Sequence, residues 1–281
     1  MRSYMEVNSV GTATLLEQLT TRKVRRLLVA SSMSIYGEGR YRTQRGEIHD
    51  SVSRALSDLK AGIWDPTNAD GEPLTPLPTP EQKVPMLNSV YALSKYDQER
   101  MCLMFGTAYN VPTVALRLFN TYGPRQALSN PYTGVLAIFA ARLLNGKPPV
   151  VFEDGQQRRD FVNVRDVARA FVLALTSETA VGRAINIGSG VSLSVLEIAR
   201  RLAQVLRLPQ TSAEIAGQYR VGDIRHCFAD TTLSRELLGY EASVSLREGL
   251  TELGEWLQAE RTVDTYDVAR RELEARGLTL G

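Results

Sequence analysis

Cysteine and histidine are scarce in this 281-residue sequence, which contains two of each. Cys102 and Cys227 lack the close spacing of metal-binding cysteines, and neither His49 nor His226 has a suitable partner nearby in the sequence. We therefore expect no metal site and no nucleophile triad built around histidine. Two unpaired thiols are typical of proteins in a reducing compartment, so we expect a cytoplasmic location.

Charge of one sign and long hydrophobic runs are also lacking. The formal net charge is +2, which favours neither a nucleic-acid partner nor an anionic membrane surface. The longest apolar stretch, 134–142, is much shorter than the ~20 residues that span a bilayer, and the sequence shows no signal-peptide pattern. We expect neither a nucleic-acid partner nor a membrane partner.

Among the features that are present, the segment Ser89–Arg100 carries the clearest chemistry. Its apolar and polar residues follow helical spacing, which places Tyr91 and Lys95 on one face, one turn apart. A nearby cation favours the phenolate form of tyrosine, whose pKa is ordinarily about 10, and so brings a general base closer to neutral pH. Ordinary helices often show the same spacing with a core tyrosine and a solvated lysine, so the pair needs support from other motifs.

Two short apolar segments provide that support. Arg25–Ser32 and Thr113–Phe119 have the pattern of buried parallel strands. The first ends in hydroxyl residues, and the second is followed by Asn120. Because ligands bind at the carboxyl ends of the strands in open parallel sheets, we expect Ser32, Asn120 and the Tyr91 helix to meet at one crevice.

Together these segments resemble the extended short-chain dehydrogenase/reductase family, specifically its nucleotide-sugar epimerases and dehydratases. Further markers with the order and spacing of that family are Gly11-Thr12, Arg159-Asp160-Phe161, Asn186-Ile-Gly188-Ser-Gly190 and Arg220-Val-Gly-Asp223. The resemblance implies an α/β fold with a doubly wound parallel, Rossmann-type sheet and a smaller α/β substrate domain. It assigns residues 1–120 to the cofactor domain, with an insertion at 39–85 and a return of 161–187 to that domain, and residues 121–281 to the substrate domain.

In that family, the sheet opens with a glycine-rich turn that binds the cofactor pyrophosphate at a helix N-terminus. No glycine occurs here before Gly11, and Leu193 stands where the later Gly188-Ser-Gly190 would need a third glycine. Against the family pattern, about three strand–helix units, roughly 90 residues at about 30 per unit, are absent before the helix expected over Tyr4–Thr20. Either the sequence is truncated, which we favour, or it is a short product that has lost its cofactor. In both cases we expect weak NAD binding and an inactive chain.

The resemblance also implies NAD as the cofactor and assigns roles to single residues. Tyr91 would take the proton from a sugar hydroxyl, Lys95 would hold the cofactor ribose and lower the pKa of Tyr91, and Ser32 would relay the proton. The alternative for Ser32 is a hydroxyl that caps its own turn. Phe119 would also contact the cofactor, through its backbone. The residues implied for binding a nucleoside diphosphate sugar are Ser32, Ser34, Asn120, Val135, Phe152, Arg159, Arg220 and Asp223, with the two arginines on the diphosphate.

The residues after Ser32 bear on the reaction type. Elimination at carbons 5 and 6 needs an extra acid and base, which dehydratases of this family supply as Asp-Glu directly after the catalytic hydroxyl. Met33 and Ser34 occupy these positions, and Ser34 also weakens a decarboxylase, which tends to have a glutamate there. We therefore expect an NAD-dependent nucleotide-sugar 4-epimerase, acting by transient oxidation to a 4-keto sugar. The alternatives that stay open are a nucleotide-sugar dehydratase, a decarboxylase or a one-way keto-sugar reductase of the same family, and a non-catalytic relative without cofactor.

The insertion and the oligomeric state follow from the same resemblance. The proline-rich part of the insertion, 71–80, predicts a restricted, extended loop. We expect a lid or rim over the substrate crevice, with a peptide-binding tract as the alternative. The insertion resembles that of the dTDP-L-rhamnose 4-epimerase branch, with UDP-glucose as second choice, although 68–71 replaces a Cys-x-x-Cys-Gly often present there. Helices corresponding to 4–20 and 91–109 pair across a two-fold axis in the family, so we expect a homodimer.

Pattern alone predicts the remaining elements. We interpret Asp166 as a structural residue that caps its helix. Helices are expected at 50–61, 134–145, 164–176, 193–206, 230–238 and 246–260, strands at 149–152 and 183–188, and a charged, helix-prone tail at 262–276.

Overall fold

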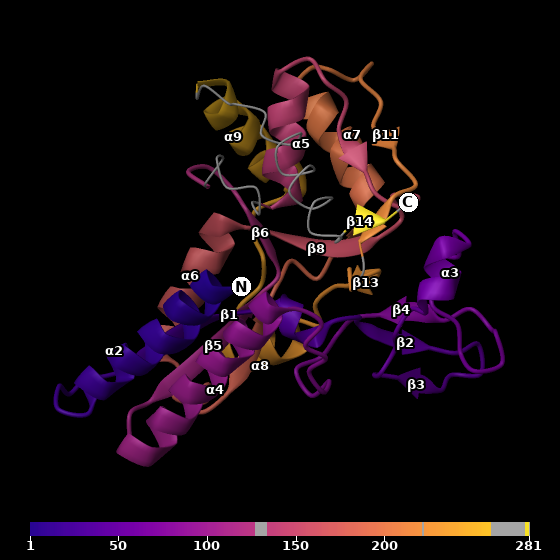
Figure 1. Ribbon diagram of the computed structural model, residues 1–281. Coiled ribbons are helices and arrows are strands. Elements are labelled where there is room, and N and C mark those ends of the chain that lie inside the picture. The colour runs from indigo at the N-terminus through magenta and orange to yellow at the C-terminus, as the bar shows by residue number, and fades with distance from the viewer. Residues whose placement is uncertain (127–133, 221, 260–278, 281) are drawn as a thin grey trace.

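A three-stranded parallel sheet forms the centre of the first part of the chain (Figure 1). The computed structural model describes residues 1–126, 134–220, 222–259 and 279–280. The strands are β1 (Leu27–Ser32), β5 (Thr113–Leu118) and β9 (Ala184–Ile187), in the order β1-β5-β9. The α/β fold with a parallel, Rossmann-type sheet is as predicted, and β1 and β5 lie where their apolar runs placed them.

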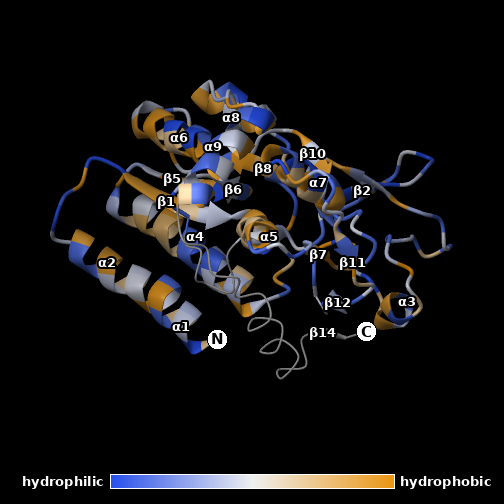
Figure 2. Cartoon of the chain, turned by 90° about the horizontal axis from the view of Figure 1, so that it is seen from above, coloured by the Kyte–Doolittle hydropathy of each residue, from blue (hydrophilic) through white to orange (hydrophobic). Residues whose placement is uncertain are grey.

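Helices cover both faces of this sheet, which explains why its strands are mostly apolar. On one face lie α4 (Val90–Tyr109) and a continuous helical segment made of α1 (Arg2–Tyr4), the π-helical turn η1 (Met5–Val10) and α2 (Gly11–Leu19). On the other face lie α6 (Val164–Thr176) and α8 (Thr232–Leu238) (Figure 2). Neighbouring residues of β5 divide between them, since Ala115 packs with Leu16 and Phe105 whereas Val114 packs with Ala170.

The second part of the chain is organised around β8 (Arg158–Asn163). Strand β8 pairs antiparallel with β10 (Ser192–Ser194) and parallel with β6 (Asn120–Tyr122) and β13 (His226–Cys227). Helices α5 (Val135–Leu144), α7 (Val195–Val205) and α9 (Leu246–Ala259) enclose a separate core with residues such as Phe139, Phe161, Leu202 and Leu253. The short pairs β7 (Val150–Val151) with β11 (Glu214–Ile215), and β12 (Tyr219–Arg220) with β14 (Thr279–Leu280), lie at its edge.

Residues 161–187, predicted to return to the cofactor domain, divide between the two sheets. Their last strand, β9, lies in the first sheet, and α6 covers that sheet, whereas Phe161 still belongs to β8. The helices predicted at 134–145, 164–176, 193–206, 230–238 and 246–260 form to within a few residues. The tail predicted at 262–276 lies outside the described residues. None of the described helices is both long and apolar enough to cross a bilayer.

The insertion folds into a small antiparallel sheet of β2 (Arg40–Arg42), β3 (Ile48–His49) and β4 (Thr75–Leu77), with one short helix, α3 (Leu56–Lys60). The helix predicted at 50–61 is therefore wrong over 50–55. The reason is tertiary, because Val52 is buried with Tyr41 and Leu74 in a small core, and Arg54 is drawn into an ion pair with Glu153 in the second part of the chain.

Asp166 is structural, as predicted, but it does not cap its helix. Asn163 caps α6, with its side-chain oxygen accepting the Arg165 N–H at 2.8 Å. The buried Asp166 carboxylate instead accepts hydrogen bonds from the backbone of Ser243 and Val244. It therefore fixes the segment that leads into α9.

Candidate active site

Tyr91 lies in the first turn of α4, at the edge of the sheet. The helix begins there because Ser89 is its N-cap, with Oγ accepting the Ala92 N–H at 3.0 Å. Tyr91 is 38% exposed, and its ring meets the ring of Tyr4 edge-on, at 5.4 Å between centroids. The alternative of a tyrosine buried in the core does not apply to this residue.

Lys95, one turn further along α4, reaches the neighbouring strand. Its Nζ donates to the carbonyl oxygen of Ala30 at 2.5 Å and to Oε1 of Gln98 at 2.7 Å. Ala30 lies in β1 two residues before Ser32, so the ammonium sits close to the carboxyl end of that strand. Burial lowers the pKa of the Lys95 ammonium below its ordinary value.

Ser32 ends β1 and caps the short 3₁₀ helix η2 (Met33–Tyr36). Its Oγ accepts hydrogen bonds from the Ser34 N–H at 3.2 Å and from the Ser34 hydroxyl at 2.9 Å. The capping alternative raised for Ser32 is thus part of its role. Because both contacts use its oxygen as acceptor, the Ser32 hydroxyl keeps its own proton for donation.

Beneath these groups lies a buried polar network that the sequence motifs did not reveal. Arg117, in β5, donates from Nη2 and Nε to the two carboxylate oxygens of Glu99 at 2.7 and 3.0 Å. Ser31 donates to the same carboxylate at 2.6 Å, and Arg117 also donates to the Tyr36 hydroxyl at 2.8 Å. The sequence contained one signal for this network, a single arginine within the apolar run Val114–Leu118. A cation in a buried strand needs a buried partner.

Phe119 and Asn120 follow β5 toward the second part of the chain. The Phe119 N–H completes the pairing with β9 by donating to the Ile187 carbonyl oxygen at 3.0 Å. Asn120 opens β6 opposite Phe161, two residues beyond Arg159 in β8. Within the described parts of the chain, the buried Oδ1 of Asn120 has no hydrogen-bond partner.

The residues predicted for the nucleotide diphosphate gather around β12 and the loop after β7. The Arg220 guanidinium lies over the Phe152 ring, 4.7 Å from its centroid. Its Nε is buried and finds no hydrogen-bond partner among the residues that the structure describes. Asp223 follows on the same segment, partly exposed, and its carboxylate lies 3.9 Å from Arg159 Nη2.

Arg159 uses much of its guanidinium on the backbone. Nη1 donates to the carbonyl oxygens of Arg158 and Arg225 at 2.9 and 3.0 Å, and Nη2 donates to that of Ile224. Arg159 therefore holds the 223–225 segment in place, which leaves Arg220 the better placed of the two arginines for an anionic ligand. Val135 begins α5, half-buried beside the second core.

Two of the sequence markers have a structural explanation. The fully buried carboxylate of Asp160 accepts hydrogen bonds from the N–H groups of Ser189 and Gly190, at 2.7 and 2.9 Å. A Cβ added to Gly188 would lie 2.6 Å from this carboxylate, so glycine is required there. These markers build the turn after β9 and need no ligand to account for them.

The predicted site residues thus form two groups. Tyr91, Lys95, Ser32 and Ser34 lie at the edge of the parallel sheet, and Phe152, Arg159, Arg220 and Asp223 lie in the second part of the chain. Asn120 stands between them, on the strand beside β8. No group of histidine, cysteine, aspartate and glutamate within the described ranges could hold a metal ion.

Comparison with known proteins places this arrangement in a family. A model for the NAD dependent epimerase/dehydratase family matches residues 69–188. A dTDP-L-rhamnose 4-epimerase from Burkholderia thailandensis is 35% identical over 257 residues, covering 90% of this chain and 69% of that protein. The chain belongs to this epimerase/dehydratase family.

Solved structures of the family agree with this assignment. UDP-glucose 4-epimerase from Thermotoga maritima, crystallised with UDP-glucose, has a TM-score of 0.72 at 29% identity, over 92% of this chain and 71% of that one. UDP-glucuronic acid 4-epimerase from Bacillus cereus, crystallised with UDP-glucuronic acid and NAD, has a TM-score of 0.66 at 26% identity, over 90% and 67%. Dehydratases and a decarboxylase, at 27% identity or below, are also relatives, so membership of the family does not by itself select the reaction.

Proposed function

We propose that this chain carries the substrate-binding and proton-transfer parts of an NAD-dependent nucleotide-sugar 4-epimerase. The observation that carries the proposal is the placement of Tyr91 and Lys95 on α4, with Lys95 bound to the strand that ends at Ser32. The identity to a dTDP-L-rhamnose 4-epimerase supports that sugar as the first choice of substrate. UDP-glucose is the second choice.

In the proposed reaction, Tyr91 takes the proton from the sugar hydroxyl at carbon 4 and later returns it to the same oxygen. NAD, held by Tyr91, Lys95 and the backbone of Phe119, would supply a reversible hydride acceptor for carbon 4. Ser32 donates a hydrogen bond from its hydroxyl to the sugar oxygen, while the N–H and hydroxyl of Ser34 donate to the Ser32 oxygen. Positions 33 and 34 offer no carboxylate for elimination, which supports epimerisation over dehydration.

The chain contains residues that would contact one end of the cofactor, around its ribose. Lys95 uses two of its three N–H bonds on Ala30 and Gln98, and the third would hold a ribose hydroxyl together with Tyr91. Phe119 would contribute its backbone. The sequence contains no Gly-x-x-Gly-x-x-Gly for the pyrophosphate end. We therefore expect weak NAD binding by this chain alone, and little or no turnover.

Two buried atoms, one in the second group and one on Asn120 between the groups, support a nucleotide sugar as the ligand. Buried polar atoms without a hydrogen bond are rare in folded proteins, and those that occur need an explanation. Arg220 Nε is a donor that suits a phosphate oxygen, and Asn120 Oδ1 is an acceptor that suits a sugar hydroxyl. Both lie on residues predicted for the substrate, so a nucleotide sugar would satisfy them.

A homodimer is part of the proposal. The helical segment of η1 and α2 packs beside α4, and each exposes apolar side chains, including Val7, Val10 and Leu15 on the first and Leu93 and Met104 on the second. A two-fold pairing of these helices would cover them. We expect a dimer by sedimentation velocity, a monomer for Val10→Glu, and a dimer again for the control Val172→Glu on α6. A monomeric wild type would contradict this part. The cytoplasmic location is also proposed, and the buried free thiols Cys102 and Cys227 agree with it.

Calorimetry and NMR test the main proposal. The purified chain is titrated with dTDP-L-rhamnose and UDP-glucose, and the sugar is then incubated with NAD and followed by proton NMR for inversion at carbon 4. We expect binding of one nucleotide sugar, and Tyr91→Phe should keep that binding while reducing any inversion by about 10²–10⁴-fold. Tyr109→Phe, at the far end of α4, is the matched control and should behave as the wild type.

These outcomes distinguish a one-way reductase from an epimerase and test whether the chain binds a nucleotide sugar. Product formation that consumes reduced cofactor in step would indicate a one-way reductase. Binding without inversion is the result expected of the chain alone or of a non-catalytic relative. Absence of binding at millimolar concentrations of both nucleotide sugars would overturn the proposal.

A further inference from the structure

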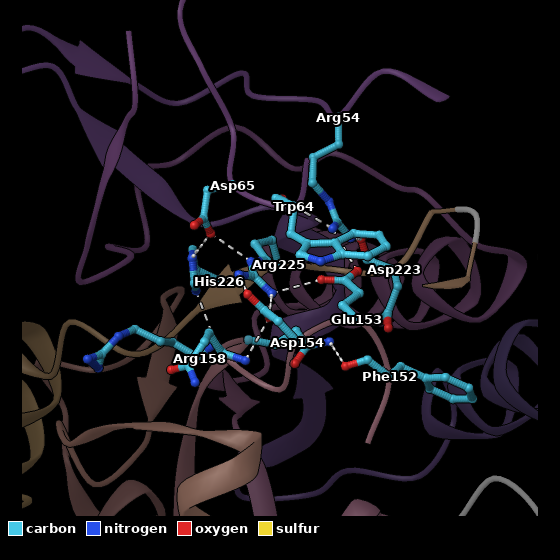
Figure 3. A network of polar contacts seen from close by, with 12 residues as sticks. Arg54, Trp64, Asp65, Phe152, Glu153, Asp154, Arg158, Asp223, Arg225 and His226 are labelled. Carbon is cyan, nitrogen blue, oxygen red and sulfur yellow. Dashed lines mark hydrogen bonds and ion pairs between the residues drawn. The ribbon is translucent and has the colours of Figure 1, made fainter. Parts of the chain in front are cut away.

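One buried arginine of the insertion contacts the candidate nucleotide site (Figure 3). Arg54 Nη1 donates to Oε1 of Glu153 at 2.7 Å, and its Nη2 donates to the carbonyl oxygen of Asp223 at 2.8 Å. A weaker contact of 3.5 Å joins its Nε to Glu38. The Arg54 side chain is only 5% exposed, and Glu153 is 1% exposed. A single guanidinium thus spans the loop after β7 and the segment after β12.

A second arginine completes the cluster from the other side. Arg225 is fully buried and donates to the other Glu153 oxygen at 2.9 Å, and to both oxygens of Asp154 at 2.6 and 2.9 Å. It also pairs with Asp65 of the insertion at 2.8 Å. Charges this deeply buried persist only when they are paired and hydrogen-bonded, so the cluster forms as a unit.

The backbone conformation of Glu153 explains why the turn needs these ion pairs. Glu153 has a φ of 54°, in the left-handed region that non-glycine residues rarely adopt because it strains the backbone. Its N–H donates to the Gln218 carbonyl oxygen at 2.8 Å, which ties the turn to the segment leading into β12. The preceding residue, Phe152, lies under the Arg220 guanidinium. By pairing with Glu153, Arg54 and Arg225 therefore hold the turn that positions the Phe152 ring under the Arg220 guanidinium.

We propose that Arg54 is a positioning residue for the nucleotide end of the substrate site. It holds Glu153, and through it the Phe152–Arg220 pair, and it holds Asp223 directly by its carbonyl oxygen. The inference rests on the proposed function, because these are the residues assigned there to the nucleoside diphosphate. Through Arg54, the insertion then raises the affinity for the nucleotide by holding the residues that bind it. It has no part in proton transfer at Tyr91.

Titration calorimetry with UDP and with dTDP tests this assignment on the full chain. The variants are Arg54→Ala, Arg54→Lys and the control Arg40→Ala. Arg40 is matched because it lies in the same insertion and pairs its guanidinium with Asp50 at 2.7 and 2.8 Å, a partly exposed pair within the insertion. Thermal unfolding of each variant is measured in parallel, and binding is measured well below each midpoint.

We expect Arg40→Ala to bind within twofold of the wild type and Arg54→Ala to bind at least tenfold more weakly. A lysine at 54 keeps an ion pair with Glu153 but cannot span both Glu153 and the Asp223 carbonyl group. Arg54→Lys should therefore regain most of the thermal midpoint and still bind at least threefold more weakly. A purely structural role predicts that affinity recovers together with the midpoint.

The results distinguish the two levels of the argument. If the wild type binds neither nucleoside diphosphate, the proposed function fails and this inference fails with it. If the wild type binds and Arg54→Lys binds equally well, the inference is overturned while the proposed function stands. An equal loss in Arg40→Ala would also overturn it, because the effect would then belong to the insertion in general. Arg54→Lys decides the question if Arg54→Ala does not fold.

Discussion

Replacing Glu99 with glutamine tests how the catalytic helix is held on the sheet. Glu99 lies on α4 four residues after Lys95 and eight after Tyr91, and its carboxylate receives both Arg117 and the Ser31 hydroxyl. Glutamine has nearly the same shape, but it is neutral and has one acceptor oxygen in place of two. The substitution leaves the Arg117 cation, 8% exposed, without its counter-ion.

The burial of the Glu99–Arg117 ion pair determines how much stability the substitution costs. Breaking a buried pair by neutralising one partner destabilises a protein by about 3–5 kcal/mol, because the remaining charge is uncompensated. For a chain of this size, each kcal/mol lowers the thermal midpoint by about 2–4 °C. We therefore expect Glu99→Gln to lower the midpoint by roughly 6–20 °C. The control is Glu178→Gln, whose pair with Arg26 has a similar distance of 2.5 Å but an 82% exposed carboxylate, and should change stability by less than about 1 kcal/mol.

Urea and thermal unfolding, followed by circular dichroism and tryptophan fluorescence, measure both variants. Coincidence of the two probes checks that unfolding is a single transition. The double variant Glu99→Leu/Arg117→Met removes both charges and should be less destabilised than the sum of its single changes by at least about 2 kcal/mol. Strictly additive effects, or a Glu99→Gln variant as stable as the Glu178→Gln control, would refute the reasoning.

Three further predictions concern other parts of the chain. Gly188→Ala should cost about 2 kcal/mol in urea unfolding, because the new methyl group would overlap the immobile Asp160 carboxylate; an unchanged midpoint would show that the turn can shift. Burial lowers the pKa of His226, so as the pH falls through the unfolded value of about 6.5 the unfolded state takes up the proton more readily than the folded state, and stability falls as the pH falls. His226→Gln should flatten the urea midpoint between pH 7 and 5.5, whereas parallel curves for variant and wild type would contradict this. Burial raises the pKa of Cys102 to about 11 and that of Cys227 to about 12, so both thiols should react with a disulfide reagent at pH 8 only after unfolding in urea.

Local pattern was sufficient for most of the fold. The spacing around Tyr91 predicted α4, and the apolar runs before Ser32 and Asn120 predicted β1 and β5, because burial on both faces leaves a simple sequence signature. The insertion helix was wrong at 50–55, where Val52 and Arg54 are placed by contacts outside their own segment. Propensity has no access to such contacts.

The candidate site was predictable only in part, for a related reason. Family resemblance supplied single residues such as Tyr91 and Arg220, but it did not supply what holds them. Arg54 bonds to residues 99 and 169 positions away, so no motif links them. Arg117 was not predicted as part of the site, although a cation within an apolar strand requires a buried acid, and nothing in the sequence identifies Glu99 as that acid.

Two separate arginine networks hold the two ends of the candidate site, and their separation has a measurable consequence. The Glu99–Arg117 network fixes the helix that carries Tyr91, and the Arg54–Glu153–Arg225 cluster fixes the segments that carry Phe152 and Arg220. Residues that share no partners usually contribute additively to stability. Glu99→Gln and Arg54→Lys should therefore add within about 0.5 kcal/mol in the free energy of unfolding, and only Arg54→Lys should weaken nucleotide binding. A coupling free energy well above that limit would mean that one network holds both ends of the site. A substitution near Tyr91 would then also change the affinity for the nucleotide.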